Sequence, residues 1–215
     1  MPERASLLTT PTTSAVHGVY ERLAPLYDLL YGPMLTPGRR RAMARLMPRP
    51  GETILEVGVG TGRQLRAYPA GCRVVAIDLS ASMLARAHAR LRKGVASQVL
   101  LCQMDASHLA FAAGQFDAVY APYVINVVPD PLAVAAEMRR VCRRYGRLVF
   151  LNHFEQAGQT SDAIDRIIGT IATRVTGVNW SLDLDAFIES SGLEALSVER
   201  VNVPQVSSVV VCRNA

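Results

Sequence analysis

The sequence predicts an α/β protein: a doubly wound, mostly parallel sheet of seven strands with an antiparallel edge strand, helices on both faces and extra N-terminal helices. Short apolar runs alternate with stretches of helical periodicity from residue 53 onward, which is typical of parallel strands joined by helices. A glycine-rich turn follows the first of these runs. The last two runs, 194–201 and 206–212, have a short connection, which indicates an antiparallel hairpin at the sheet edge.

Length and composition are those of one folded domain. The chain has 215 residues, half of them hydrophobic. It has neither an apolar run of about eighteen residues nor the apolar core of a signal peptide, so we expect no transmembrane helix and no export. Because no C-x-x-C or H-E-x-x-H grouping occurs, we expect no metal site. Scattered cysteines favour free thiols in the reducing cytoplasm: Cys72, Cys102, Cys142 and Cys212.

The first part of the chain predicts two helices. Residues 1–13 are rich in threonine and proline and are expected to form a mobile tail. Ser14 is a suitable N-cap for a helix over 14–31, which Gly32-Pro33 is expected to end. A second helix is expected over 36–46, with a proline in its first turn.

The remaining elements follow from periodicity and from turn residues. Strands are expected at 53–57, 73–78, 98–102, 116–120 and 147–152, before the final hairpin. Helices are expected from Gly62, from Ser80 to Lys93, from Pro131 to near Gly146, near 160–175 and near 183–191.

The glycine-rich turn, Glu56-Val57-Gly58-Val59-Gly60-Thr61-Gly62, is the strongest functional motif. Its alternate glycines let the backbone turn sharply and leave room for a ligand. The helix expected from Gly62 would present unpaired N–H groups to that ligand. Asp78 ends the second strand twenty residues after Gly58, where an acid can accept hydrogen bonds from both ribose hydroxyls of a nucleoside.

The spacing of this motif argues against a dinucleotide. The pattern G-x-G-x-x-G requires a third glycine at position 63, which is Arg63. Glu56, beside the turn, would repel a pyrophosphate and would favour a cationic amine. The motif therefore predicts a nucleoside ligand that carries a positive charge and no phosphate.

These residues resemble the motifs of the class I methyltransferases. The glycine-rich turn is similar to their first motif, Val74-Val75-Ala76-Ile77-Asp78-Leu79-Ser80 to their second, and Gln103-Met104-Asp105-Ala106 to their third, in which an acid meets the adenine amino group. The resemblance implies a Rossmann-like fold, S-adenosylmethionine as the methyl donor and S-adenosylhomocysteine as the product. The donor is expected in the crevice at the carboxyl ends of the first four strands, where the strand order reverses. The predicted donor-binding residues are Tyr20, Glu56, Gly58, Gly60, Thr61, Gly62, Asp78, Leu79, Ser80, Met83, Asp105 and Ala106.

The helix expected over 14–31 carries an apolar stripe that includes Tyr20, Tyr27 and Tyr31. One interpretation is an amphipathic helix packed on the core with its phenols outward. The other is a lid whose phenols line the methyl-transfer site and hold cationic groups. An apolar helix in a basic chain also suits a bilayer interface.

A finer resemblance involves the segments 19–33, 123–131 and 151–154. Together they look like the bacterial phosphatidylethanolamine N-methyltransferases of the membrane-associating type. That resemblance implies successive methyl transfers to the amine of phosphatidylethanolamine towards phosphatidylcholine. Quinone C-methyltransferases share a tyrosine-aspartate entry helix, so Tyr27-Asp28 does not choose between the two substrates.

The chemistry of such an acceptor suggests the catalytic residues. An amine with a pKa of about 10 must lose a proton before it can attack a methyl group. The site then needs oxygen acceptors, aromatic walls and a cationic clamp for the phosphate, for which Arg22 and Arg174 are two of many candidates. A base at the end of a strand is one interpretation of His153, and a structural histidine is the other. The candidates are Tyr27, Tyr31, Tyr123, Asn126 and His153.

The net charge of +5 comes almost wholly from grouped arginines. Such a balance favours an anionic membrane surface or a nucleic acid, and the ordinary alternative is a solvated helix face. Because the arginines lack interleaved aromatic residues, we expect no nucleic acid. We expect a cytoplasmic protein, peripherally bound to the inner face of the membrane through its N-terminal helix and arginines.

The resulting organisation is a mobile tail over 1–13, a helical lid that contacts the membrane over 14–47 and a methyltransferase domain over 48–215. Two alternative functions remain open. One is a methyltransferase that acts on a quinone or a small amine, and the other is a non-catalytic protein that binds membranes.

Overall fold

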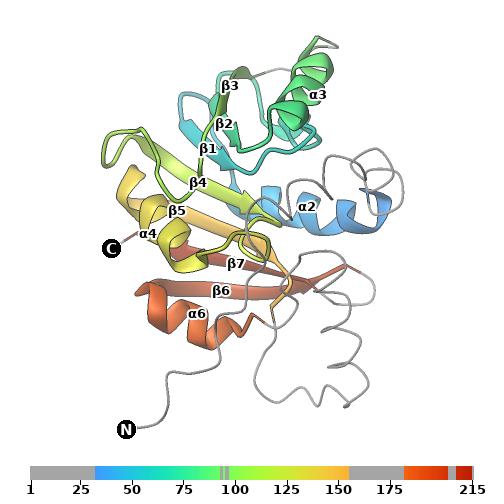
Figure 1. Ribbon diagram of the computed structural model, residues 1–215. Coiled ribbons are helices and arrows are strands. Elements are labelled where there is room, and N and C mark those ends of the chain that lie inside the picture. Colours follow the sequence, from blue (N-terminus) through green and yellow to red (C-terminus); the bar gives the residue numbers. More distant parts are fainter. Residues whose placement is uncertain (1–31, 93, 95–96, 155–181, 203–206, 215) are drawn as a thin grey trace, which may run out of the picture.

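The computed structural model describes residues 32–92, 94, 97–154, 182–202 and 207–214 (Figure 1). Within these ranges seven strands form one sheet in the order β3-β2-β1-β4-β5-β7-β6. The strands are β1 (Thr53–Val57), β2 (Arg73–Asp78), β3 (Gln98–Gln103), β4 (Phe116–Pro122), β5 (Cys142–Asn152), β6 (Glu194–Val201) and β7 (Ser207–Arg213). The predicted doubly wound α/β fold is confirmed.

The pairing of the strands places the switch point beside β1. The first five strands are parallel, and β1 lies between β2 and β4. The chain therefore winds outward in both directions from β1, and ligands of such sheets bind at the carboxyl ends of the strands on either side of this point. The predicted hairpin is also present: β7 is antiparallel to both of its neighbours, β5 and β6, and β6 forms the edge.

Helices cover both faces of the sheet (Figure 1). They are α2 (Gly32–Leu46), the 3₁₀ turn η1 (Leu65–Ala67), α3 (Ala81–Leu91), α4 (Pro131–Val141) and α6 (Leu184–Ser191). One buried cluster joins α2, η1 and α3 to one face, and a second joins α4 and α6 to the other. Three of these helices begin at a side-chain cap, because Ser80, Asp130 and Asp183 each accept a bond from a backbone N–H in the first turn.

The prediction of a helix from Gly62 is wrong, because only the single 3₁₀ turn η1 forms there. Tyr68 precedes Pro69, and a residue before proline is disfavoured in the helical region. Tyr68 is accordingly extended, with φ −75° and ψ 132°. No long helix therefore begins directly after the glycine turn.

The helix expected to end near Gly146 also differs, because α4 ends at Val141. The side-chain amide of Asn214 donates to the carbonyls of Arg139, Cys142 and Arg143 at 3.0, 2.8 and 3.2 Å. These bonds satisfy carbonyls at the end of the helix and release the chain into β5. A cap that comes from 72 residues away leaves no local signal.

The helix expected over 36–46 begins earlier than predicted, because α2 opens at Gly32 with Pro33 in its first turn. A proline in the first turn loses no hydrogen bond, because the N–H groups there have no partner within the helix. The expectations for the tail 1–13, the helix over 14–31 and the helix near 160–175 lie outside the described residues.

Among the described helices, none is both long enough and apolar enough to cross a bilayer. All four cysteines lie in the described ranges and are free. No group of three potential metal-binding side chains occurs in that part of the chain.

Candidate active site

The glycine turn lies at the carboxyl end of β1, and its three glycines have positive φ angles of 69°, 53° and 74°. A Cβ atom on Gly58 would lie 1.9 Å from Cγ2 of Val124, so this glycine permits close packing of the turn against the loop after β4. A Cβ atom on Gly60 would meet nothing within 4 Å. The open side of the turn is therefore at Gly60, where a ligand can approach the backbone.

Asp78 joins this turn to the end of β2. Its Oδ2 accepts a hydrogen bond from the N–H of Gly60 at 2.8 Å, and its Oδ1 accepts one from the N–H of Ser80 at 2.9 Å. Ser80 in turn caps α3 by accepting a bond from the N–H of Met83 at 3.3 Å. A carboxylate is thus held at the rim of the open space beside Gly60.

The third motif lies at the same edge of the sheet. The N–H of Met104 donates to the carbonyl of Asp78 at 3.1 Å, and the side chain of Gln103 donates to the carbonyl of Leu79 at 3.0 Å. Asp105 is exposed and accepts a bond from the N–H of Ser107 at 2.8 Å. The structure therefore brings the predicted residues after β2 and β3 together, with Ala106 and Met83 half-buried among them.

Glu56 lies deeper than the sequence suggests. Only 1% of its surface is exposed, and its carboxylate accepts a hydrogen bond from the Tyr68 hydroxyl at 2.8 Å. Burial raises the pKa of Glu56 to about 7, against the opposing effects of the Tyr68 hydrogen bond and the charge of Arg39. Burial and the neighbouring Glu56 also raise the pKa of Tyr68 well above its ordinary value. The carboxylate is therefore held beneath the surface by Tyr68, and Thr61 of the glycine turn is buried as well.

Tyr123 directly follows the carboxyl end of β4. Its φ angle is 59°, an uncommon value for a residue with a large side chain, and such strain clusters at functional sites. Its hydroxyl accepts a bond from the amide of Asn202 at 3.0 Å. Its ring lies 5.6 Å from the ring of His153 and 5.2 Å from the guanidinium carbon of Arg39. Burial raises the pKa of the Tyr123 phenol, so the hydroxyl stays protonated at neutral pH.

Asn126 and His153 are joined to each other. The Asn126 side chain donates to the His153 carbonyl at 2.7 Å and accepts from the His153 N–H at 3.0 Å. Nδ1 of His153 lies 3.1 Å from the hydroxyl of Ser207. Both side chains are buried, so the pair fixes the loops after β4 and β5 relative to one another.

Asn202 is a site residue that the sequence analysis missed. Its side chain accepts a bond from the N–H of Gly38 at 2.8 Å and donates to Tyr123 and to Ser207, the latter at 2.9 Å. It thereby joins α2 to the ends of β4, β6 and β7. Its position just after a strand is the one local signal, because two of its three partners, Gly38 and Tyr123, lie far away in the sequence.

The three predicted tyrosines of the N-terminal segment, Tyr20, Tyr27 and Tyr31, lie outside the described residues. The remaining predicted residues lie at or just after the carboxyl ends of the parallel strands, on one edge of the sheet. An open glycine turn, a carboxylate at the end of β2 and an exposed acid after β3 fit a ligand with ribose hydroxyls and a positive charge. Fold and site together define a nucleoside-binding α/β protein.

Comparison with known proteins gives the family. A family model described as Methyltransferase domain matches residues 55–150. The chain is 40% identical over 155 residues to phosphatidylethanolamine N-methyltransferase of Cereibacter sphaeroides, a match that covers 72% of this chain and 75% of that protein. The chain belongs to the class I S-adenosylmethionine-dependent methyltransferases, and S-adenosylmethionine is its methyl donor.

Other relatives differ in the reaction that their names state. The ubiquinone/menaquinone biosynthesis C-methyltransferase UbiE of Burkholderia vietnamiensis is 34% identical over 157 residues, which cover 68% of this chain but less than two thirds, 63%, of that protein. The crystal structure of the [4+2]-cyclase SpnF superposes with a TM-score of 0.74 and 19% identity over 98% of each chain. That likeness shows the fold alone, and a fold does not determine a reaction.

Proposed function

We propose that the protein transfers methyl groups from S-adenosylmethionine to the amine of phosphatidylethanolamine, and then to its mono- and dimethylated forms, towards phosphatidylcholine. The observation that carries this proposal is the match to an enzyme of that name at 40% identity over most of both chains. The polar cluster of Tyr123, Asn202 and Ser207 beside the glycine turn supports it, because an amine acceptor needs oxygen atoms and an aromatic wall.

The donor supplies an electrophilic methyl group on a sulfonium. The protein must present a neutral amine in line with that group, because only the neutral form has a lone pair, and the ordinary pKa of such an amine is about 10. As the nitrogen–carbon bond forms, the carbon–sulfur bond breaks and S-adenosylhomocysteine leaves. The amine proton is lost beforehand. A base is one of the two interpretations of His153, and His153→Gln tests whether this residue accepts the proton.

In this proposal the ring of Tyr123 forms a wall beside the acceptor, and its hydroxyl is oriented by the amide of Asn202. Asn126 acts by holding the backbone of His153 in place. We further propose that residues 14–47 form a lid that contacts the membrane, with the arginines of this basic chain facing anionic lipid. The part of that lid that the structure describes, α2, packs on the sheet through Ala42, Met43 and Leu46.

The test is an assay with donor labelled in its methyl group and a mixture of phosphatidylethanolamine and a demethylated quinone in one set of vesicles. Label in the headgroup supports the proposal. Label in the quinone contradicts it and favours the reaction that the UbiE relative is named for. A protein that only binds membranes leaves both lipids unlabelled.

A further inference from the structure

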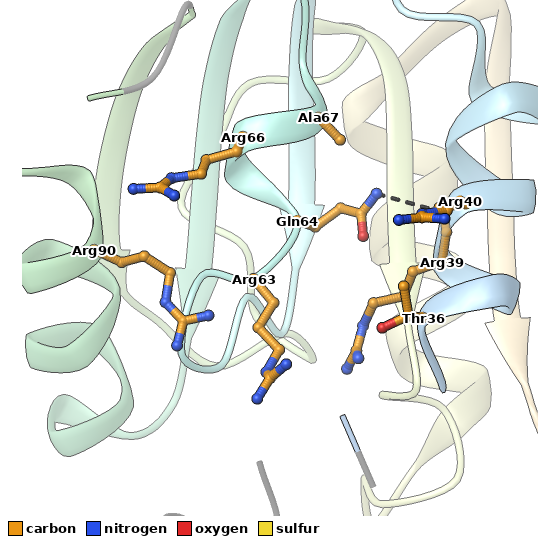
Figure 2. Close-up of a pocket in the computed structure, with 8 residues that line it drawn as sticks. All are labelled: Thr36, Arg39, Arg40, Arg63, Gln64, Arg66, Ala67 and Arg90. Atoms are coloured by element: carbon orange, nitrogen blue, oxygen red, sulfur yellow. Dashed lines mark hydrogen bonds between the residues drawn. The ribbon is translucent and has the colours of Figure 1, made fainter. Parts of the chain in front are cut away.

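A pocket of about 520 Å³ lies between α2, η1 and α3, beside the glycine turn (Figure 2). Of the eight described residues that line it, five are arginines and the other three are uncharged. The arginines are Arg39 and Arg40 of α2, Arg63 two residues before η1, Arg66 within η1, and Arg90 of α3. We call this cavity the arginine pocket.

The local fold explains how these side chains meet. The single turn η1 lies between α2 and α3, and all three contribute to the lining of the pocket (Figure 2). Gln64 links the start of η1 to α2, since its side chain donates to the carbonyl of Arg39 at 3.4 Å. Figure 2 shows the side chains of Arg63 and Arg39 extending toward the same edge of the pocket.

The described part of the pocket lining carries one sign of charge. Among the described residues that line it there are five arginines and no aspartate or glutamate. Concentrating like charges in a concave site costs free energy, and it raises the local concentration of anions.

The pocket also adjoins the acceptor side of the crevice. Arg39 lines the pocket, and its guanidinium carbon lies 5.2 Å from the centre of the Tyr123 ring. Guanidinium groups bind phosphate oxygens through paired hydrogen bonds, which makes arginine the preferred residue for this anion. In phosphatidylethanolamine the phosphate is only two carbons from the amine.

We propose that the arginine pocket binds a phosphate ester and, resting on the proposed function, that it holds the phosphate of the acceptor lipid during methyl transfer. The acceptor is then recognised at two points: the amine beside Tyr123 and the phosphate among the arginines. Free phosphate esters share this chemistry, so the experiment separates the two sources.

The first measurement is calorimetric titration of the full chain with sn-glycerol 3-phosphate. We expect wild-type protein to bind with a Kd at or below about 1 mM, and Arg66→Gln/Arg90→Gln to weaken binding by about tenfold or more. The matched control is Arg86→Gln/Arg92→Gln, which removes the same charge from α3 and its C-terminal cap outside the pocket. Equal affinity in wild type and the pocket variant, or no binding by wild type, overturns the proposal.

The second measurement is methyl transfer to phosphatidylethanolamine in uncharged detergent micelles, which removes attraction to an anionic surface. The pocket variant is expected to raise the KM for the lipid by about tenfold, with the KM for S-adenosylmethionine unchanged. If glycerol 3-phosphate binding depends on the arginines while the lipid KM does not, the pocket serves a free phosphate ester and its assignment to the acceptor is overturned.

The two proposals fail in different ways. If wild-type protein methylates no phosphatidylethanolamine but still binds glycerol 3-phosphate through Arg66 and Arg90, the proposed function falls, and the phosphate site stands. If phosphatidylethanolamine is methylated equally well by wild type and the pocket variant, the function stands and the role of the pocket in it falls. Thermal unfolding of each variant shows whether it is folded.

Discussion

The carboxylate of Asp78 accepts a hydrogen bond from the backbone N–H of Gly60, with 2.8 Å between Oδ2 and N. One residue ends β2 and the other is the middle glycine of the turn after β1, so the bond joins two of the motifs that the sequence analysis singled out. The second oxygen of Asp78 accepts from Ser80 and so ties in the start of α3. A single carboxylate therefore positions both loops beside the open face of Gly60.

Asp78→Asn is expected to weaken binding of S-adenosylmethionine by about ten- to a hundredfold, because a hydrogen bond to a charged group contributes about 1.5–3 kcal/mol. The change keeps the shape of the side chain and removes its charge. Calorimetric titration measures the loss. Asp185→Asn, on the exposed side of α6, is the matched control and is expected to bind the donor as wild type does. Wild-type affinity in Asp78→Asn would contradict the assignment.

Two alanine substitutions in the glycine turn are expected to separate packing from binding. Gly58→Ala places a methyl group 1.9 Å from Val124, so we expect it to lower the free energy of unfolding by about 2–4 kcal/mol through strain and overpacking. Gly60→Ala meets no neighbour within 4 Å and is expected to cost about 1 kcal/mol, while it blocks the donor. Urea unfolding combined with donor titration distinguishes the two. Full donor affinity in a folded Gly60→Ala variant would show that this face is not used.

Glu56 is expected to make stability depend on pH. Burial raises its pKa from 4.5 to about 7, so between these values the native state holds a proton that the unfolded state has released. The contribution of Glu56 to the free energy of unfolding is therefore greatest below about pH 4.5 and falls as the pH rises to about 7.

Glu56→Gln removes this contribution. Relative to wild type, the variant should gain about 3 kcal/mol of unfolding free energy between pH 4.5 and pH 7. Urea unfolding at several pH values measures the difference between the two proteins, in which the other titrating groups cancel. A constant difference across this range would show that the Glu56 carboxyl ionises in the folded protein much as it does in the unfolded chain.

Tyr123→Phe tests the acceptor side. It removes the hydroxyl that Asn202 bonds, so we expect a loss of about 1 kcal/mol in stability and an unchanged affinity for the donor. If the hydroxyl faces the acceptor amine, kcat with phosphatidylethanolamine falls by about tenfold or more. Tyr145→Phe, at a tyrosine that is 64% exposed, is the control and should leave kcat unchanged. A wild-type kcat in Tyr123→Phe would remove this tyrosine from the site.

Much of the fold could be predicted because its signals are local. Each of the five parallel strands lies where an apolar run was found, and Ser80, Asp130 and Asp183 begin helices as short polar caps are expected to do. The glycine turn and Asp78 lie side by side because parallel strands bring their carboxyl ends to one edge.

What could not be predicted depends on contacts between distant residues. The cap of α4 by Asn214 and the contact of Asn202 with Tyr123 join segments 72 or more residues apart. The burial of Glu56 against Tyr68 depends on how the chain turns after η1. The short length of η1 is a different case, because a local signal for it exists. The Tyr68-Pro69 pair disfavours a helix at this position, but the prediction followed the helical periodicity instead.

The central claim is that the glycine turn and Asp78 hold the methyl donor at the switch point of the sheet. A crystal structure of the full chain with S-adenosylhomocysteine tests it most directly. We predict that the adenosine lies against the open face of Gly60, with its ribose hydroxyls bonded to the Asp78 carboxylate. Density for the nucleoside anywhere else, with Asp78 making no contact to the ribose, would contradict it.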